Sequence, residues 1–194
     1  RALAILAAFS PSEPRLSLAE LLRRTGLYKS TLLRLITSLE ASGYLVHDAA
    51  DGDYQIGPSS LRLANIYQRS LNGGKLISEA LARMVAATEE NANFYGRRGD
   101  VRVCIYCVDS PHAMRHHTLV GDIFPLDKGA AGRLLSAFSD DRADLPGIAD
   151  IRASHFAVSH GEYAAYLSAV ATPVFGFNNR CEGALATTGL TDRF

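Results

Sequence analysis

The chain has 194 residues, of which 47% are hydrophobic and 21% charged, as in a globular protein of one large domain or two small ones. Its net charge is zero, which argues against a general nucleic-acid coat protein, and no apolar run approaches the roughly 20 residues that a membrane-spanning helix needs. We recognise no secretory leader and therefore expect a cytoplasmic protein, and the start at Arg1 indicates a piece of a longer chain.

Two short helices joined by a tight turn are the clearest feature of the sequence, and a helix over residues 1–9 precedes them. The first of the pair begins at a capping box, in which the Ser17 hydroxyl accepts a backbone N–H and the Glu20 carboxylate reaches back to the cap. Its end is marked by Gly26, because glycine tolerates positive φ. The next helix starts soon afterwards, at Lys29, so the two form a helix-turn-helix.

The second helix of this pair, from Lys29 to Ser42, has two different faces. One is an apolar stripe at i, i+3, i+4 and i+7. On the other, Arg34 can reach a guanine edge and Leu33 can pack on a thymine methyl, while Lys29 and hydroxyls at the helix start can hold a phosphate. An ordinary amphipathic surface helix would carry some of the same residues, and that interpretation stays open. The stripe consists of Leu32, Leu35, Ile36 and Leu39, and the predicted DNA-binding residues are Tyr28, Lys29, Ser30, Thr31, Leu33, Arg34 and Thr37.

A β-hairpin is predicted directly after the helix-turn-helix. Gly43 closes the helix, and short strands over residues 44–47 and 54–56 flank a polar turn with an Asp-Gly signal. This hairpin would be the wing of a winged helix-turn-helix. The basic charge of the region is modest, so tight DNA binding requires a dimer that doubles the phosphate contacts. Residues 15–34 carry a single acid, Glu20, against Arg15, Arg23, Arg24, Lys29 and Arg34.

A helix over residues 59–71 follows, and the Gly73-Gly74 break after it is the natural domain boundary. This helix packs on its counterpart in another subunit or on the wing, or it is a plain connector, and the sequence leaves these alternatives open. Beyond the break, a second helical run and then short strands and turns are typical of a mixed α/β sensor domain. The elements predicted there are strands over 93–97, 102–108 and 115–120, a helix opening at Gly129, and a final hairpin of 171–177 and 183–188.

Cysteines and histidines in the second half raise the question of a metal or redox site. Cys104 and Cys107 form a C-x-x-C, but residues three apart on a strand point to opposite faces, and no second C-x-x-C completes a zinc site. We therefore interpret them as packing residues in a reduced compartment. His116 and His117 would also face opposite ways on a strand, so we do not expect them to converge with His112 on a metal. Neither a metal nor another cofactor is predicted.

Several stretches of the sequence resemble the IclR family of bacterial transcriptional regulators. In the first half these are RALAILAAF, LSLAELLRRTGLYKSTLLRLITSLEASGYL and YQIGPSSLRLA. In the second half they are DSPHAMRHHTLVGDIFPLDKGAAGRLLSAF, the Glu162-Tyr163 pair and ATPVFGFNNRCEGALATTG. The resemblance covers nearly the whole chain and is closer in the half with the helix-turn-helix.

The resemblance implies an α+β fold in three parts. Residues 1–58 would be a winged helix-turn-helix DNA-binding domain, 59–73 a linker helix, and 74–194 a GAF-like α/β domain for effector binding and oligomerisation. The family places a loop and a complete helix in the segment 140–162, where this sequence is short. Either the protein lacks these elements or residues near 145–155 are unobserved, and we expect the second alternative.

The resemblance also implies a place for a small-molecule effector, walled by the start of a helix in the second half, the segment after Phe156 and the last strand. Small side chains at that helix start would let a ligand carboxylate approach free backbone amides. The family commonly has an Asp and a Cys where Ser159 and Ala169 stand here. It commonly has serines at the positions of Ala186 and Thr188. This sequence therefore has fewer polar side chains at the effector site, and we expect a larger, partly apolar acid as the effector. The predicted effector-binding residues are Ala113, Gly129, Ala130, Ala131, Ser159, Ala169, Ala186 and Thr188.

Together these features predict a ligand-responsive transcriptional regulator. Its partners would be a double-stranded DNA operator, a small organic effector such as a carboxylate or an aromatic acid, and further copies of itself in a homodimer or a dimer of dimers. Two alternatives stay open: an enzyme with a DNA-binding appendage and a ligand-free architectural DNA-binding protein. The enzyme is disfavoured, because Ser110, Ser136 and Ser168 lack a nucleophile-elbow context and residues 129–132 lack the P-loop lysine. We predict no catalytic residue and no membrane partner.

Overall fold

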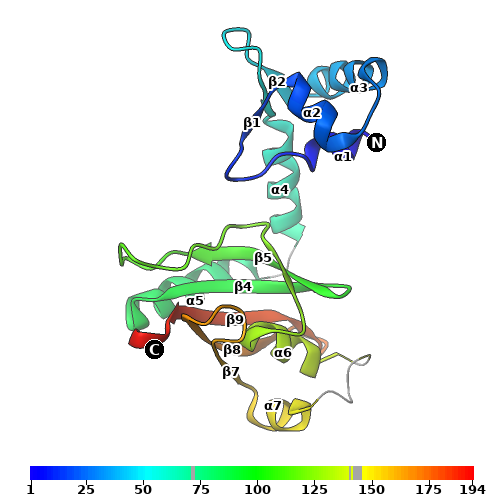
Figure 1. The fold of residues 1–194 in the computed structure, drawn as a ribbon. Helices are drawn as coiled ribbons and strands as arrows, with labels where there is room; N and C mark the ends of the chain where they lie inside the picture. The colour runs from blue at the N-terminus through cyan, green and yellow to red at the C-terminus, as the bar shows by residue number, and fades with distance from the viewer. Residues whose placement is uncertain (71–72, 140, 142–145) are drawn as a thin grey trace. The chain divides into compact units, whose positions relative to one another are not determined.

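The computed structural model describes residues 1–70, 73–139, 141 and 146–194. The chain divides into two compact units, Arg1–Leu71 and Asn72–Phe194, whose elements are labelled in Figure 1. Residues 71–72 of the predicted linker helix 59–73 lie outside the described residues. None of the helices in the described ranges is long and apolar enough to cross a membrane.

The first unit combines helices with a small antiparallel sheet. Its elements are α1 (Ala2–Leu6), β1 (Arg15–Leu16), α2 (Leu18–Thr25), α3 (Lys29–Ala41), β2 (Leu45–His47), β3 (Tyr54–Ile56) and α4 (Ser59–Ser70). The predicted helix-turn-helix and hairpin are both present, and the sheet has the order β1-β3-β2. The first helix ends earlier than predicted, and β1 was not predicted because two residues show no alternation.

The core of this unit confirms most of the predicted apolar stripe of α3. Leu32, Ile36 and Leu39 are buried. Leu35 is only half-buried, which corrects the predicted stripe. At about 100° per residue it lies at the rim of the stripe, so it packs against the core from its edge. The buried cluster consists of Ile5, Leu16, Leu21, Leu32, Ile36, Leu39, Leu45 and Tyr54.

Glycines end both helices of the helix-turn-helix, as predicted. Gly26 caps α2 with φ 63°, and Gly43 follows α3 with φ 72°. Both lie in the left-handed region that residues with a Cβ rarely adopt. Gly57 is required for a different reason, because a Cβ there would overlap the carbonyl oxygen of Gly43, where β3 ends against the end of α3.

The second unit is built on an antiparallel sheet with the strand order β6-β5-β4-β9-β8-β7. Its elements are α5 (Gly74–Thr88), β4 (Asn91–Arg98), β5 (Val101–Val108), β6 (Ile123–Pro125), α6 (Gly129–Ala137), α7 (Ile148–Ser154), β7 (Ala157–His160), β8 (Leu167–Phe175), β9 (Cys181–Leu190) and a 3₁₀ turn (Thr191–Arg193). Helix α5 packs on β4 and β5, whereas α6 packs on β7, β8 and β9 across the other face of the sheet (Figure 1). The predicted α+β fold is confirmed.

Two segments of this unit differ from the prediction. Residues 115–119 form no strand, because side chains rather than a ladder hold their backbone: the Asn91 amide donates to the His116 carbonyl, and the Asp122 carboxylate accepts from Leu119 N at 2.8 Å. The short segment 140–162 contains α7 and β7, which were not predicted. Seven residues are too few to show a helical period, so α7 escaped detection. Residues 140 and 142–145 of that segment lie outside the described residues.

A β-bulge overturns the prediction that the two C-x-x-C thiols face opposite ways. Phe94 pairs with Tyr106 and Tyr95 with Cys104, so β5 contains one extra residue between the two pairs. The extra residue reverses the face to which the following side chains of β5 point. Cys104 and Cys107 therefore pack against the same core cluster beneath α6. Burial raises the pKa of both thiols, which keeps them neutral and supports their interpretation as packing residues.

Candidate DNA-binding face and ligand cavity

The predicted DNA-binding residues form one surface of α3. Tyr28 precedes the helix in an extended conformation and is 86% exposed, and no side chain caps the first backbone amides of α3. Thr31 is half-buried, unlike the others. The Thr37 hydroxyl donates to the Leu33 carbonyl at 3.1 Å, so its lone pairs remain available to accept from a base. The exposed members of the set are Tyr28, Lys29, Ser30, Leu33, Arg34 and Thr37.

The basic charge of this region is smaller than the sequence indicated. Arg15 lies 3.1 Å from Asp48 and 2.8 Å from Asp51, two acids of the wing turn. Arg23 and Arg24 pair with acids as well. Within the described parts of the chain, the two basic residues of α3, Lys29 and Arg34, are left without an acidic partner. The charge that remains for DNA therefore lies on the recognition helix itself.

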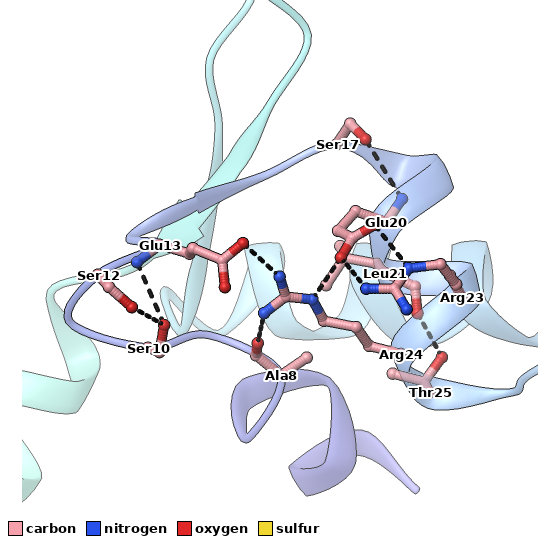
Figure 2. Close-up of polar contacts among 10 residues, drawn as sticks. All are labelled: Ala8, Ser10, Ser12, Glu13, Ser17, Glu20, Leu21, Arg23, Arg24 and Thr25. Atoms are coloured by element: carbon pink, nitrogen blue, oxygen red, sulfur yellow. Dashed lines mark hydrogen bonds and ion pairs between the residues drawn. The ribbon is translucent and has the colours of Figure 1, made fainter.

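Glu20 forms only half of the predicted capping box. Its backbone N–H donates to the Ser17 hydroxyl at 3.2 Å, as predicted, but its carboxylate accepts from Arg23 and Arg24 rather than reaching back to the cap (Figure 2). Hydrogen bonds from the two guanidiniums lower the pKa of Glu20 to about 2. Arg24 also donates to the Ala8 carbonyl at 2.9 Å, so this cluster ties α2 to the end of α1.

A cavity of about 40 Å³ opens in the second unit at the start of α6. Ala113 lies elsewhere, in an exposed loop, so this predicted effector residue is not part of it. The remaining seven predicted residues all line the cavity, namely Gly129, Ala130, Ala131, Ser159, Ala169, Ala186 and Thr188. The residues that the sequence did not predict there are Tyr95, Arg102, His116, Phe124, Tyr163, Leu167 and Ser168.

The first two backbone amides of α6 are not free, contrary to the prediction. Gly129 N donates to the Glu162 carboxylate at 3.0 Å, and Ala130 N donates to the Ser159 hydroxyl at 3.0 Å. Glu162 also accepts from Arg133 at 2.8 Å. The chain thus supplies its own acceptors to this helix start. These two amides are therefore not available to a ligand.

Arg102 is the charged group inside the cavity wall. It is only 6% exposed, and its guanidinium carbon lies 5.4 Å from the ring centre of Tyr95 and 5.2 Å from that of Phe124. One terminal nitrogen donates to the carbonyls of Pro125 and Lys128. Burial lowers the pKa of Arg102. Arg102 was not predicted as a site residue, although the sequence contains a signal for it, because this arginine interrupts an otherwise apolar strand.

Hydroxyl and imidazole groups complete the polar lining. The Ser168 hydroxyl lies 2.9 Å from His160 Nδ1 and donates to the Thr191 hydroxyl at 3.1 Å. Because its proton is directed to Thr191, this serine is not poised as a nucleophile activated by the histidine. Burial lowers the pKa of His116. Among the described residues, no group of three or more His, Cys, Asp or Glu side chains could hold a metal ion.

Comparisons with known proteins agree with this architecture. Residues 1–49 match the IclR helix-turn-helix domain. The glycerol operon regulatory protein of Streptomyces griseus is 28% identical, over 100% of this chain and 84% of that protein. An IclR transcriptional regulator from Alicyclobacillus acidocaldarius has a TM-score of 0.83 at 24% identity, over 100% of this chain and 89% of the other. An IclR homologue from Microbacterium hydrocarbonoxydans, crystallised with 4-hydroxybenzoate, has a TM-score of 0.81 at 15% identity, over 97% of this chain and 87% of the other.

Proposed function

Because the chain is an IclR-family helix-turn-helix transcriptional regulator rather than an enzyme, we propose that a small organic acid controls its binding to operator DNA. The acid binds in the cavity of the second unit, whereas α3 in the first unit contacts the DNA. The observation that supports this division is that seven residues, expected from the family resemblance to bind an effector, surround one cavity. The protein acts in the cytoplasm as a homodimer or a dimer of dimers.

On DNA, the exposed face of α3 divides into base-reading and phosphate-binding positions. Arg34 donates to a guanine edge, Thr37 accepts from a base amino group, and Leu33 packs on a thymine methyl. Lys29 and the uncapped amides at the helix start hold a phosphate. Since Lys29 and Arg34 are the unpaired basic residues of the described helix-turn-helix, one copy makes few phosphate contacts. A dimer on a pseudo-palindromic operator doubles them.

Control follows from a difference in effector affinity between two arrangements of the oligomer. An acid that binds one arrangement more tightly shifts the population of DNA-competent dimers by that difference alone. Helix α4, which joins the two units in the chain, transmits the shift. The effector carries a carboxylate, and aromatic acids belong to the class to be screened, since 4-hydroxybenzoate is bound by the Microbacterium homologue.

The test is an operator titration with and without acids that raise the melting temperature in a screen. Ala131→Leu fills the cavity, because Ala131 is 4% exposed and lines it. This variant should lose the effector response and keep the operator affinity of the protein without effector. Ala86→Leu, at an exposed position of α5, is the matched control and should respond normally. Product formation from a stabilising acid would indicate an enzyme, and the absence of stabilisation by any acid would favour the architectural role.

A further inference from the structure

We propose that Arg102 is the specificity-determining residue of the effector cavity, where it restricts binding to ligands that carry a carboxylate. This inference rests on the proposed function of the cavity as an effector site. It goes beyond that function because it assigns the acid-binding role to one residue, which lies on β5 outside the predicted set. It also excludes neutral ligands of the same shape.

The first observation is a buried cation without a counter-ion. Arg102 is 6% exposed, and its Nε has no hydrogen-bond partner. Its hydrogen bonds go to the neutral carbonyls of Pro125 and Lys128, and no carboxylate of the described chain forms an ion pair with it. Arginine is rarely buried without a paired charge, and an orphaned buried donor costs free energy. An acid group in the cavity would supply the missing partner.

The second observation is the positive charge that lies beside the start of α6. A Cβ at Gly132 would lie 2.6 Å from Arg102 Nη1, so the glycine lets the guanidinium lie directly against the start of α6. That helix start itself carries partial positive charge. Glu162 already pairs with Arg133 and Gly129 N, so it does not neutralise Arg102. Burial lowers the pKa of Arg102 and the charge of the exposed Asp127 partly opposes this shift, but no ion pair forms between the two side chains in the described chain. The arrangement attracts an anion and repels a cation.

The third observation is an unsatisfied amide on the same face of the sheet. Neither the oxygen nor the nitrogen of the buried Asn93 side chain has a hydrogen-bond partner. Asn93 pairs in register with Ala186, a lining residue, and directly opposed residues of an antiparallel ladder point to the same face. Buried polar groups without a hydrogen-bond partner therefore lie on the side of the sheet where the cavity lies.

The size of the cavity limits what can reach Arg102. Its volume is about 40 Å³. By comparison, a dry cavity of roughly 150 Å³ binds a benzene molecule. The space therefore suits a carboxylate with a few attached atoms, either as a whole small acid or as the acid end of a longer one. An aromatic ring would have to remain at the mouth or displace Tyr163, which is 48% exposed.

The experiment measures binding of matched acid and amide pairs by calorimetry to the full chain. The pairs are propionate with propionamide and benzoate with benzamide, so that a small acid is compared with an aromatic one. The wild-type protein should bind at least one acid about tenfold or more tightly than its amide, because hydrogen bonds to a charged group stabilise more than neutral ones. Arg102→Gln should weaken acid binding by about tenfold or more and leave amide binding unchanged. Arg102→Lys should restore most of the acid affinity.

The possible failures are distinguishable. Equal binding of acids and amides by the wild type, or unchanged acid affinity in a folded Arg102→Gln variant, overturns the role of Arg102 and leaves the effector cavity intact. If Arg102→Gln does not fold, the role of Arg102 is still tested by the acid affinity of Arg102→Lys and by the comparison of each acid with its amide in the wild type. Absence of binding by every acid and amide overturns both the inference and the proposed function.

Discussion

Single side chains of α3 separate two contributions to DNA binding. Arg34→Ala should lose roughly 1–3 kcal/mol on the operator, concentrated at one base position, since Arg34 is proposed to contact a base edge. Lys29→Ala should weaken all sequences similarly and reduce the salt slope by about one. Binding titrations on the operator and on unrelated DNA, each at several salt concentrations, measure both effects.

Arg23→Ala is the matched control for these variants. Arg23 is an exposed arginine of the same region, but it is paired with Glu20. The substitution should leave operator binding nearly unchanged. If Arg34→Ala and Lys29→Ala also bind like wild type, the assigned face of α3 is wrong.

The arginine cluster around Glu20 predicts a response to acid. The pKa of the Glu20 carboxylate is lowered from 4.5 to about 2 in the folded protein. The stabilisation of the fold by this carboxylate is therefore complete above pH 4.5 and is lost as the pH falls through the folded-state pKa. Between about pH 4.5 and 2, the helix-turn-helix should therefore lose more stability in the wild type than in Glu20→Gln. Urea unfolding at a series of pH values measures this difference. Glu79→Gln, an exposed glutamate on α5, should behave like wild type, and identical pH profiles for all three proteins would refute the role of the cluster.

At the level of elements, the two faces of α3 predict opposite effects of neighbouring substitutions. Leu32→Ala removes a fully buried side chain and should cost roughly 2–5 kcal/mol of unfolding free energy. Leu35→Ala should cost less, since Leu35 is half-buried. Leu33→Ala should leave stability nearly unchanged but weaken operator binding. Urea unfolding and DNA titration of the three variants check the pattern, and a stability loss at Leu33 as large as that at Leu32 would contradict it.

Elements with a strong local signal were predictable, and those set by tertiary contacts were not. The Ser17 cap of α2, the glycines that end α2 and α3, the apolar period of these helices and the turn of the hairpin are properties of neighbouring residues, so the sequence predicts them. The bulge in β5 depends on pairing with β4, and it reverses the predicted direction of Cys107. The segment 115–119 has the composition of a strand but no ladder partner, because Asn91 and Asp122 hold its backbone.

The candidate cavity was only partly accessible to sequence reasoning. Small residues at the start of α6 and on β9 were identified through the family resemblance. The acceptors that occupy the first amides of α6, Ser159 and Glu162, depend on a long-range contact with β7 and the turn after it. Arg102 interrupts an otherwise apolar strand, but its burial follows from the packing of β5 against β6 and α6, so the sequence alone does not place it in the cavity wall.

For the whole molecule, the division into two units predicts an independent second domain. A fragment from Gly74 to the end should remain folded, since its sheet and both of its helical layers lie within Asn72–Phe194. We expect it to self-associate, because the proposed oligomerisation resides in this domain. Circular dichroism and sedimentation measure the two properties. An unfolded or monomeric fragment would contradict the proposed domain organisation.

The central claim is that effector and operator binding are coupled, and thermodynamic reciprocity tests it most directly. If an effector changes operator affinity by some factor, saturating operator must change effector affinity by the same factor. The measurement is a pair of titrations on the full chain: operator with and without effector, and effector with and without operator. We predict equal factors for the wild type, and no change of operator affinity on addition of effector in Ala131→Leu. An effector that binds in the cavity but leaves operator affinity unchanged would contradict the account.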